Sequence, residues 1–339
     1  MLKIEDLLHL LNSGTEKSIA IIPHRKPDGD ALGSSLGLFH FLKKLGHQVN
    51  VVSPTDYAEN LKWLPGNEEV IIYEQSKRKG QNAIKKADLI FCLDFSNIER
   101  VEHLGTAVLS TQALKIVIDH HAKPEDFGDL LYWDVKACAT TELIYGFIAE
   151  LELTKLIDKR IATCLYTGLV TDSGSFKYAS TRSNSHQVAA ALLQHDIEHQ
   201  KIHEQIDGNV AQNALEFFGF CFQNRLKVLP EHRTAYLYAH FNDLKKFNIR
   251  TGQTEGLVNH ALNLKGIRFA ALIIDRGDLV KISFRSKGNF PANAFAEKYF
   301  HGGGHFNAAG GRSEVSLDKT LVAFEEKLAE FYPKVMESN

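Results

Sequence analysis

The stretch SIAIIPHRKPDGDALGS, residues 18–34, decides the fold that we expect. It joins an apolar run, residues 18–23, to a short polar loop, and a helical pattern begins at Ala31. Short apolar runs bounded by turn residues are typical of strands buried in a parallel sheet. The stretch therefore predicts a strand, a loop and a helix, with polar side chains at the carboxyl end of the strand.

The same alternation of apolar runs and helical patterns continues over the first two hundred residues. The predicted strands are residues 18–23, 48–53, 88–93 and 115–118. The predicted helices are residues 31–45, 84–87 with their flanks, 140–151 and 159–171. Strands that alternate with helices favour an α/β domain with a parallel sheet.

A second pattern follows. Residues 183–231 read as helical throughout, and the predicted elements beyond them are strands at 232–240, 267–274 and 279–285 and a helix at 317–332. Because 339 residues exceed one typical hydrophobic core, two domains are expected. We predict a first domain at 1–207, a helical linker at 208–230 and a smaller α+β domain at 231–339.

Composition limits the partners. The net charge is −2 and the pI is near 6.8, so no global basic field exists to hold long or duplex nucleic acid. A local basic pocket for a short anionic ligand remains open. The four cysteines form no CxxC pair, and neither a signal peptide nor a membrane-length apolar run is present. We expect a cytoplasmic protein with reduced thiols and no membrane partner.

Four polar clusters stand out in the first domain. They are His24 with Asp28 and Asp30, then Asp94, then Asp119 with His120 and His121, and finally Asp172. The first three follow predicted parallel strands, whose carboxyl ends share one edge of a sheet. A single acid at a strand end is usually a helix cap, but four such clusters favour a functional site.

Carboxylates and imidazoles without thiolates suit Mn²⁺ and related divalent ions. Crowded carboxylates repel one another at neutral pH, and two cations that share a bridging carboxylate relieve this and can activate a hydroxide. Locally, Pro27 predicts an extended Lys26, and Gly29 predicts a tight turn. We expect Asp28 and Asp30 to project from that turn on one side, just before the helix.

The second domain carries HGGGHFNAAGG at residues 301–311, where backbone N–H groups of the glycines could cradle an anion. A plain turn is the alternative. Arg285 ends a predicted strand and could hold a phosphate with two hydrogen bonds, or it could be a solvated strand-end residue.

Together these motifs resemble the DHH/DHHA1 phosphoesterase family over nearly the whole chain. The segments that carry the resemblance are HRKPDGDALGS (24–34), LDFS (93–96), VIDHH (117–121), TDSGSF (171–176) and GGGHFNAAGG (302–311). Residues 255–266 and 284–305 are most similar to the NrnA-type group of oligoribonucleases and pAp (3′-phosphoadenosine 5′-phosphate) phosphatases. The resemblance implies a parallel-sheet DHH domain, a smaller α+β DHHA1 domain and an active site in the cleft between them.

The resemblance also implies two divalent metal ions, foremost Mn²⁺, with Mg²⁺ or Co²⁺ as alternatives. The implied ligands are His24, Asp28 and Asp94 for one ion and Asp30, Asp94, His120 and Asp172 for the other. The implied catalytic residues are Asp94 as the bridge, His121 facing the substrate phosphate and Asp119 orienting the histidines. The implied substrate-binding residues are Arg285, Ser286, Gly302, Gly303, Gly304 and His305.

The activity that this resemblance implies is hydrolysis of short RNA or DNA oligonucleotides to mononucleotides, of pAp to AMP, or of both. Four alternatives stay open: a soluble phosphodiesterase of linear or cyclic di-AMP, an exopolyphosphatase- or pyrophosphatase-like hydrolase, a RecJ-like exonuclease, and a nucleotide-binding regulator without activity. The sequence leaves the physiological substrate, strand polarity, base preference and oligomeric state undecided, with a homodimer as one alternative.

Overall fold

A computed structural model describes residues 3–122, 124–208, 210–250 and 252–337. The chain divides into two compact units, Met1–Asn209 and Val210–Asn339, and each is described by itself. In the described residues, no helix combines the length and the apolar character needed to cross a membrane.

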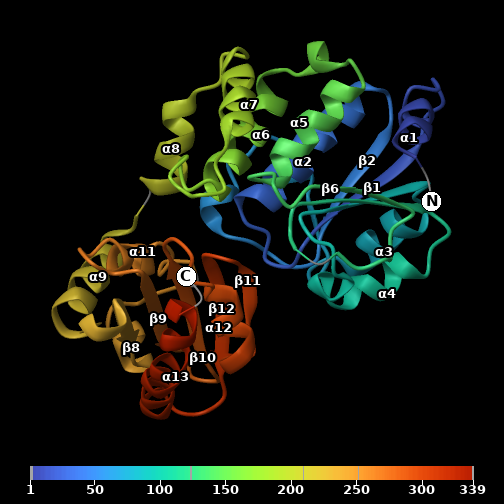
Figure 1. Ribbon diagram of the computed structural model, residues 1–339. Coiled ribbons are helices and arrows are strands. Elements are labelled where there is room, and N and C mark those ends of the chain that lie inside the picture. The colour runs from blue at the N-terminus through green and yellow to red at the C-terminus, as the bar shows by residue number, and fades with distance from the viewer. Residues whose placement is uncertain (1–2, 123, 209, 251, 338–339) are drawn as a thin grey trace. The chain divides into compact units, whose positions relative to one another are not determined.

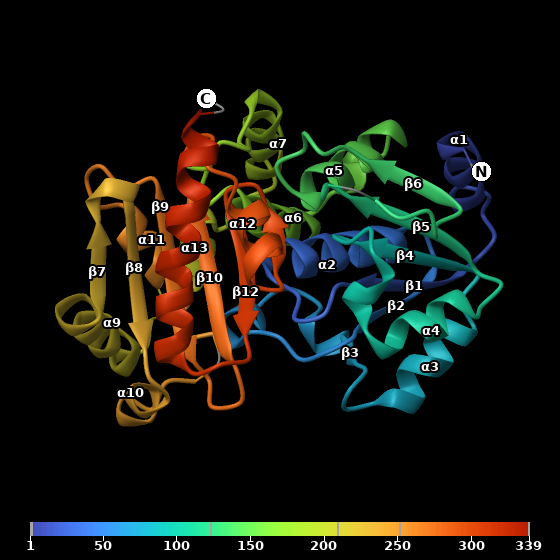
Figure 2. The ribbon, with the colours of Figure 1, turned by 60° about the horizontal axis from the view of Figure 1, so that its bottom comes forward.

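In the described part of the first unit (Figure 1), six strands form one parallel sheet in the order β3-β2-β1-β4-β5-β6, and all six are labelled in Figure 2. The strands are β1 (Ser18–Pro23), β2 (Gln48–Ser53), β3 (Ile71–Ile72), β4 (Leu89–Leu93), β5 (Leu114–Asp119) and β6 (Leu130–Trp133). The prediction of a parallel α/β sheet is confirmed. The order of the strands reverses between β1 and β4, and open sheets of this kind bind their ligands at such a point.

Both faces of this sheet are buried along β1, β2, β4 and β5, because alternate residues of these strands enter different cores. In β1, Ile19 and Ile21 belong to one core, and Ala20 and Ile22 belong to the other. The helices over the first face are α2 (Gly29–Lys44), α5 (Thr140–Glu150) and α6 (Lys159–Asp172). Those over the second face are α3 (Lys77–Lys85) and α4 (His103–Leu109). The remaining helices are α1 (Ile4–Leu11), α7 (Ser183–Leu193) and α8 (His199–Asp207).

Helices α2 and α6 approach each other closely, and glycines make this possible. A Cβ atom at Gly33 would lie 2.5 Å from the carbonyl oxygen of Cys164, and one at Gly29 would lie 2.4 Å from the side chain of Thr171. Any larger residue at these positions would push the helices apart. The close packing brings the start of α2 next to the end of α6, where Asp172 lies.

In the described part of the second unit, six strands form a sheet in the order β11-β12-β10-β9-β8-β7, antiparallel except for the pair β8–β9 (Figure 2). The strands are β7 (Leu226–Leu229), β8 (Thr234–Ala239), β9 (Phe269–Asp275), β10 (Val280–Ser286), β11 (Gly303–His305) and β12 (Ala308–Ser313). The helices are α9 (Gln212–Asn224), α10 (Phe241–Lys246), α11 (Leu257–Leu262), α12 (Ala292–Tyr299) and α13 (Leu317–Glu337). The prediction of an α+β domain is confirmed.

Helices α9 and α11 pack on one face of this sheet, while α12 and α13 pack on the other. The second face is dominated by fully buried rings, including Phe269, Phe284 and Phe324. Residues 208–230, predicted as a helical linker, contain α9 and β7, which pack in this unit. The prediction of uninterrupted helix to residue 231 is wrong at β7, because that short strand depends on pairing with β8.

Candidate metal and phosphate site

The loop after β1 enters its helix earlier than predicted. Helix α2 begins at Gly29, and the Asp28 carboxylate caps it by accepting hydrogen bonds from the N–H groups of Asp30 and Ala31. Asp28 thus precedes the helix with an extended backbone, whereas Asp30 lies in the first helical turn, so the prediction that both acids project from a turn before the helix is wrong for Asp30. Residue 29 is a glycine because a Cβ atom there would clash with the side chain of Thr171, and not because the backbone makes a tight turn.

Two residues beside the site have left-handed backbones. Lys26, predicted to be extended, has φ 49°, and its N–H donates to the hydroxyl of Thr55. Asp94 has φ 64° directly after β4, and its N–H donates to the carbonyl of Ile118. Such backbones are uncommon outside glycine and carry strain, which often marks functional positions.

Asp94 lies between two histidines and is only 2% exposed. Its Oδ2 is 3.4 Å from Nε2 of His24, and its Oδ1 is 3.5 Å from Nε2 of His120. The two oxygens of one carboxylate thus face different imidazoles. This geometry is what a carboxylate shared between two cations requires.

The predicted ligands form two groups, and Asp94 belongs to the first and contacts His120 of the second. Nε2 of His120 is 3.4 Å from Asp172 and 3.8 Å from Asp30. In each group the possible ligand atoms all lie within 4.8 Å of one another, and the groups are His24, Asp28 and Asp94, and Asp30, His120 and Asp172. The structure brings together all six residues that the sequence suggested as ligands.

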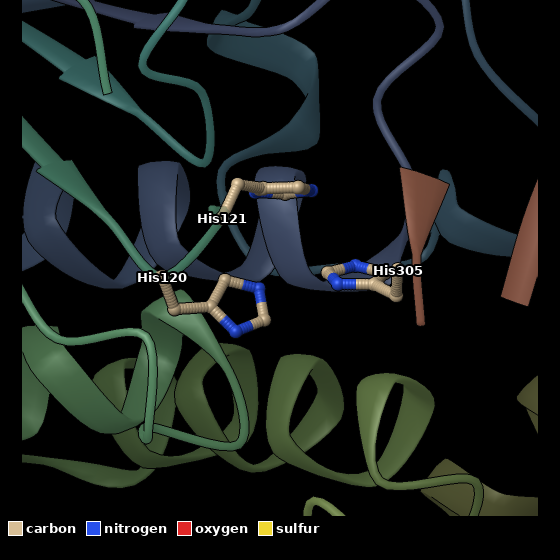
Figure 3. A group of neighbouring side chains, drawn as sticks. All are labelled: His120, His121 and His305. Atoms are coloured by element: carbon tan, nitrogen blue, oxygen red, sulfur yellow. The ribbon is translucent and has the colours of Figure 1, made fainter. Parts of the chain in front are cut away.

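His121 and Asp119 form a pair beside these groups. Nδ1 of His121 is 2.7 Å from Oδ1 of Asp119, which is fully buried. The rings of His120 and His121 lie 4.9 Å apart in an edge-to-face arrangement, both following β5 (Figure 3). The side chain of His121 is 24% exposed against 6% for His120, so His121 is the more accessible of the two.

Crowding in the buried cluster shifts the protonation of its members. Burial and then the charge of Asp94 raise the pKa of Asp30 to about 7. Burial and the charge of Asp30 likewise raise the pKa of Asp172 well above its ordinary value. Burial also raises the pKa of Asp94, but hydrogen bonds with His120 and His24 outweigh burial and hold that pKa well below its ordinary value.

The histidines complete this balance. Burial lowers the pKa of His120, but its hydrogen bond to Asp94 and the charge of Asp172 outweigh burial and raise that pKa well above its ordinary value. The protein alone therefore favours extra protons on Asp30, Asp172 and His120. Divalent cations supply the same positive charge and release those protons, so this donor set fits them.

The sequence gave no warning of one further contributor, the start of α5. The N–H groups of Thr140 and Thr141 donate to the Asp30 carboxylate, and the Thr140 hydroxyl donates to Asp94. The carbonyl of Ala137 lies 3.1 Å from Nδ1 of His120. No motif indicates this segment, because its partners lie far away in the chain.

In the second unit, Arg285 lies on β10 opposite Ala308 of β12 and is partly buried. Its guanidinium donates to the carbonyl of Phe284. The hydroxyl of Ser286 is buried; it donates to the carbonyl of Phe290 and accepts from Asn307. Ser286 and Asn307 thus fix the loop that follows Arg285.

The three glycines lead into and form β11, so the segment is part of the sheet and not a simple turn. A Cβ atom at Gly302 would lie 2.0 Å from the carbonyl oxygen of Gly310, and one at Gly304 would lie 2.6 Å from that of Ala308. Gly303 has no comparably close neighbour, so packing alone does not require a glycine there. His305 ends β11 and pairs with Ala308.

The fold and the site define a two-domain α/β protein whose first unit gathers carboxylates and imidazoles in the pattern of a divalent-cation site. Residues 18–169 match the model of the DHH family, N-terminal domain, and residues 233–333 match that of the DHHA1 domain. The chain belongs to the DHH family, with a DHHA1 domain following the DHH domain.

Relatives resemble the chain over most of its length. The bifunctional oligoribonuclease and PAP phosphatase NrnA of Bacillus subtilis is 29% identical and is covered to 88%, over 86% of this chain. The protein of the same name from Thermus thermophilus is 30% identical and is covered to 91%, over 92% of this chain. A crystal structure of an exopolyphosphatase-related protein from Bacteroides fragilis has a TM-score of 0.94 at 32% identity, covering 98% of this chain and 97% of that one.

Proposed function

We propose that the protein is a two-metal phosphoesterase that hydrolyses short oligonucleotides to mononucleotides and pAp to AMP. Its relatives are hydrolases by name, and the protein is a hydrolase of the same family. The observation that carries the proposal is the position of Asp94, whose two oxygens face the two groups of ligand atoms. The names of the NrnA relatives support the substrate class.

We propose that His24, Asp28 and Asp94 hold one cation and that Asp30, Asp94, His120 and Asp172 hold the other. Mn²⁺ is our first choice, because mixed carboxylate and imidazole ligands suit it better than Mg²⁺, and Co²⁺ is an alternative. When bound, such ions activate water and stabilise the charge that develops on the phosphoryl group. The four buried cysteines support a reducing, cytoplasmic setting.

The protein's own groups orient the substrate. We propose that His121, whose Nδ1 donates to Asp119, meets a phosphate oxygen of the substrate through Nε2. Donation from Nε2 of His121 to a phosphate oxygen would stabilise the charge on that oxygen, and the buried carboxylate of Asp119 would keep the ring oriented. Asp119 therefore acts by positioning His121.

We propose that Arg285, Ser286, Gly302, Gly303, Gly304 and His305 bind the part of the substrate remote from the reacting phosphate. Anchoring that remote part aligns a short ligand and contributes to catalysis. A net charge of −2 gives the protein no global basic field to hold a long strand. Short nucleotides should therefore be preferred.

The test is steady-state turnover with Mn²⁺ of pAp, pyrophosphate, linear and cyclic di-AMP, and a ladder of 5′-phosphorylated RNAs. We expect hydrolysis of pAp, and a kcat/KM that falls steeply beyond about five nucleotides. Arg285→Ala should lower kcat/KM for dinucleotides by the equivalent of about 1.5–3 kcal/mol in transition-state stabilisation, as expected for a lost charge-assisted hydrogen bond.

Lys287→Ala is the matched control, since it removes an exposed positive charge two residues away whose amine donates to the carbonyl of Leu262. Rates that rise with RNA length would favour a RecJ-like nuclease. Preferential turnover of pyrophosphate or cyclic di-AMP would favour those alternatives instead.

A further inference from the structure

Helix α5 lacks a cap of its own. The residue at its N-cap position, Ala139, has no side chain that can accept a hydrogen bond. The first N–H groups of the helix donate instead to Asp30: that of Thr140 to Oδ2 at 2.6 Å and that of Thr141 to Oδ1 at 2.9 Å. A carboxylate is favoured at a helix N-terminus. Asp30, which is 110 residues away in sequence, therefore takes the role of the missing cap.

The same helical turn also reaches Asp94. The hydroxyl of Thr140 donates to Asp94 Oδ1 over 2.9 Å, and the threonine is fully buried. Oδ1 is the oxygen that faces His120, whereas Oδ2 faces His24. The hydroxyl therefore restrains rotation of the carboxylate and keeps its two oxygens directed at different imidazoles.

Further contacts hold this turn in place. The buried carboxylate of Glu142, in the first turn of α5, accepts hydrogen bonds from the N–H of Cys138 and from the side chains of Asn184 and Ser185. The last two residues belong to α7, so two helices fix the position of Thr140. Preorganised partners of this kind tune a metal site through the ligands that they orient.

We propose that Thr140 is a positioning residue, whose hydroxyl holds Asp94 in the orientation that bridges the two proposed cations. The inference rests on the proposed two-metal function and adds a residue to it. Since the hydroxyl contacts Oδ1, which faces His120, its loss should weaken mainly the binding of the ion assigned to Asp30, His120 and Asp172.

The neighbouring threonine shows that burial of a hydroxyl does not by itself explain this contact. Thr141 is 1% exposed, and its hydroxyl has no hydrogen-bond partner among the described residues. The hydroxyls of these two adjacent buried threonines thus differ, because that of Thr140 contacts a proposed ligand and that of Thr141 does not. They form a matched pair for experiment.

The test is calorimetric titration of metal-free protein with MnCl₂, for wild type, Thr140→Val, Thr140→Ser and Thr141→Val. Valine keeps the shape and the backbone N–H but removes the hydroxyl. We expect Thr140→Val to bind one of the two ions about 10–100-fold more weakly. Thr140→Ser should restore the wild-type affinity, and Thr141→Val should stay within about twofold of it.

Activity and thermal unfolding separate positioning from folding. In Thr140→Val at subsaturating Mn²⁺, kcat should fall by about 10–100-fold with little change in KM, and excess Mn²⁺ should restore part of it. Equal Mn²⁺ affinity in Thr140→Val and wild type would overturn the inference, as would an equal loss in Thr141→Val.

Failure of the proposed substrate class gives a different result. If wild type binds two Mn²⁺ ions but cleaves neither pAp nor short RNA, the substrate assignment fails, and the comparison of affinities still decides the role of Thr140. If wild type binds no Mn²⁺, both proposals are wrong.

Discussion

The two units bury very different groups beside their sheets. The first places ionisable side chains at the carboxyl ends of β1, β4 and β5, including the almost fully buried Asp30 and Asp94. The second fills one face of its sheet with rings such as Phe269 and Phe290, whose centroids lie 4.3 Å apart. Apolar packing stabilises a domain without help, whereas buried like charges cost free energy unless something neutralises them.

The comparison indicates that the candidate site lowers the stability of the first unit, because its buried carboxylates repel one another. The raised pKa of Asp30 and of Asp172 shows that their charged forms are disfavoured at this position. We expect bound cations to remove that cost, since stability at functional sites is commonly exchanged for activity. The second unit should not depend on cations for its stability.

The largest expected effect is that of Asp94→Asn. The change is nearly isosteric but removes the charge that faces both histidines, so kcat should fall by at least about 1,000-fold, roughly 4 kcal/mol in activation free energy. Turnover and metal content of the purified variant should be measured together, with circular dichroism to verify its fold. A variant that keeps two tightly bound ions and a near-normal rate would show that Asp94 is not the bridge.

The aromatic core of the second unit provides the next test. Phe284 is fully buried and stacks on Phe269 and Phe324, so Phe284→Ala should destabilise this unit by about 3–5 kcal/mol. Denaturant unfolding followed by hydrogen exchange would assign the loss to β9, β10 and α13. Mn²⁺ should not reverse it; a variant rescued by Mn²⁺ would contradict the contrast between the units.

Cation binding should stabilise only the first unit. At a free Mn²⁺ concentration 100 times the dissociation constant, mass action raises the free energy of unfolding of this unit by about 2.7 kcal/mol for each ion bound. Hydrogen exchange with and without Mn²⁺ should show added protection in β4 and in the first turns of α2 and α5, with β9 and β10 unchanged. Equal protection in both units would remove the basis of the comparison.

The smallest effect tests a carboxylate of the first unit outside the site. Asp158 caps α6 by accepting from the N–H groups of Arg160 and Ile161. Burial raises its pKa, but the hydrogen bonds from Ile161 and Lys44 outweigh burial and lower it. Ionised Asp158 therefore stabilises the folded protein at pH values above its pKa in the unfolded state, about 3.9. This stabilisation is lost as pH falls through the lower pKa of the folded state.

Asp158→Ala should cost about 1 kcal/mol at pH 7, and the difference from wild type should shrink on acidification. Asp158→Asn keeps the capping oxygen and should lose less. Thermal unfolding between about pH 3 and pH 7 measures both variants. The opposite result would be a stability difference between wild type and Asp158→Ala that grows as pH falls. It would mean that folding raises the pKa of Asp158, as it raises the pKa of Asp30.

Much of this protein could be predicted from its sequence alone. The strands β1 and β4 are nearly continuous apolar runs, and β2 and β5 contain shorter ones, so local hydrophobicity was enough to locate all four. Three of the four polar clusters follow β1, β4 and β5 directly, and parallel topology then requires them to meet at one edge of the sheet. The order of strands therefore predicted their convergence, whereas the place of Asp172 and the bridging role of Asp94 were implied by the resemblance to the DHH family.

Only the tertiary structure decided the rest. The short strands β3, β6, β7 and β11 form because longer neighbours offer hydrogen bonds, and their own residues give little signal. Tertiary structure also decides why residue 29 is a glycine, because a Cβ atom there would lie 2.4 Å from the side chain of Thr171. Thr140 contacts Asp94 from 46 residues away, and such a contact exists only once the sheet and α5 have packed, because a hydrogen bond depends on position in space and not on distance along the chain.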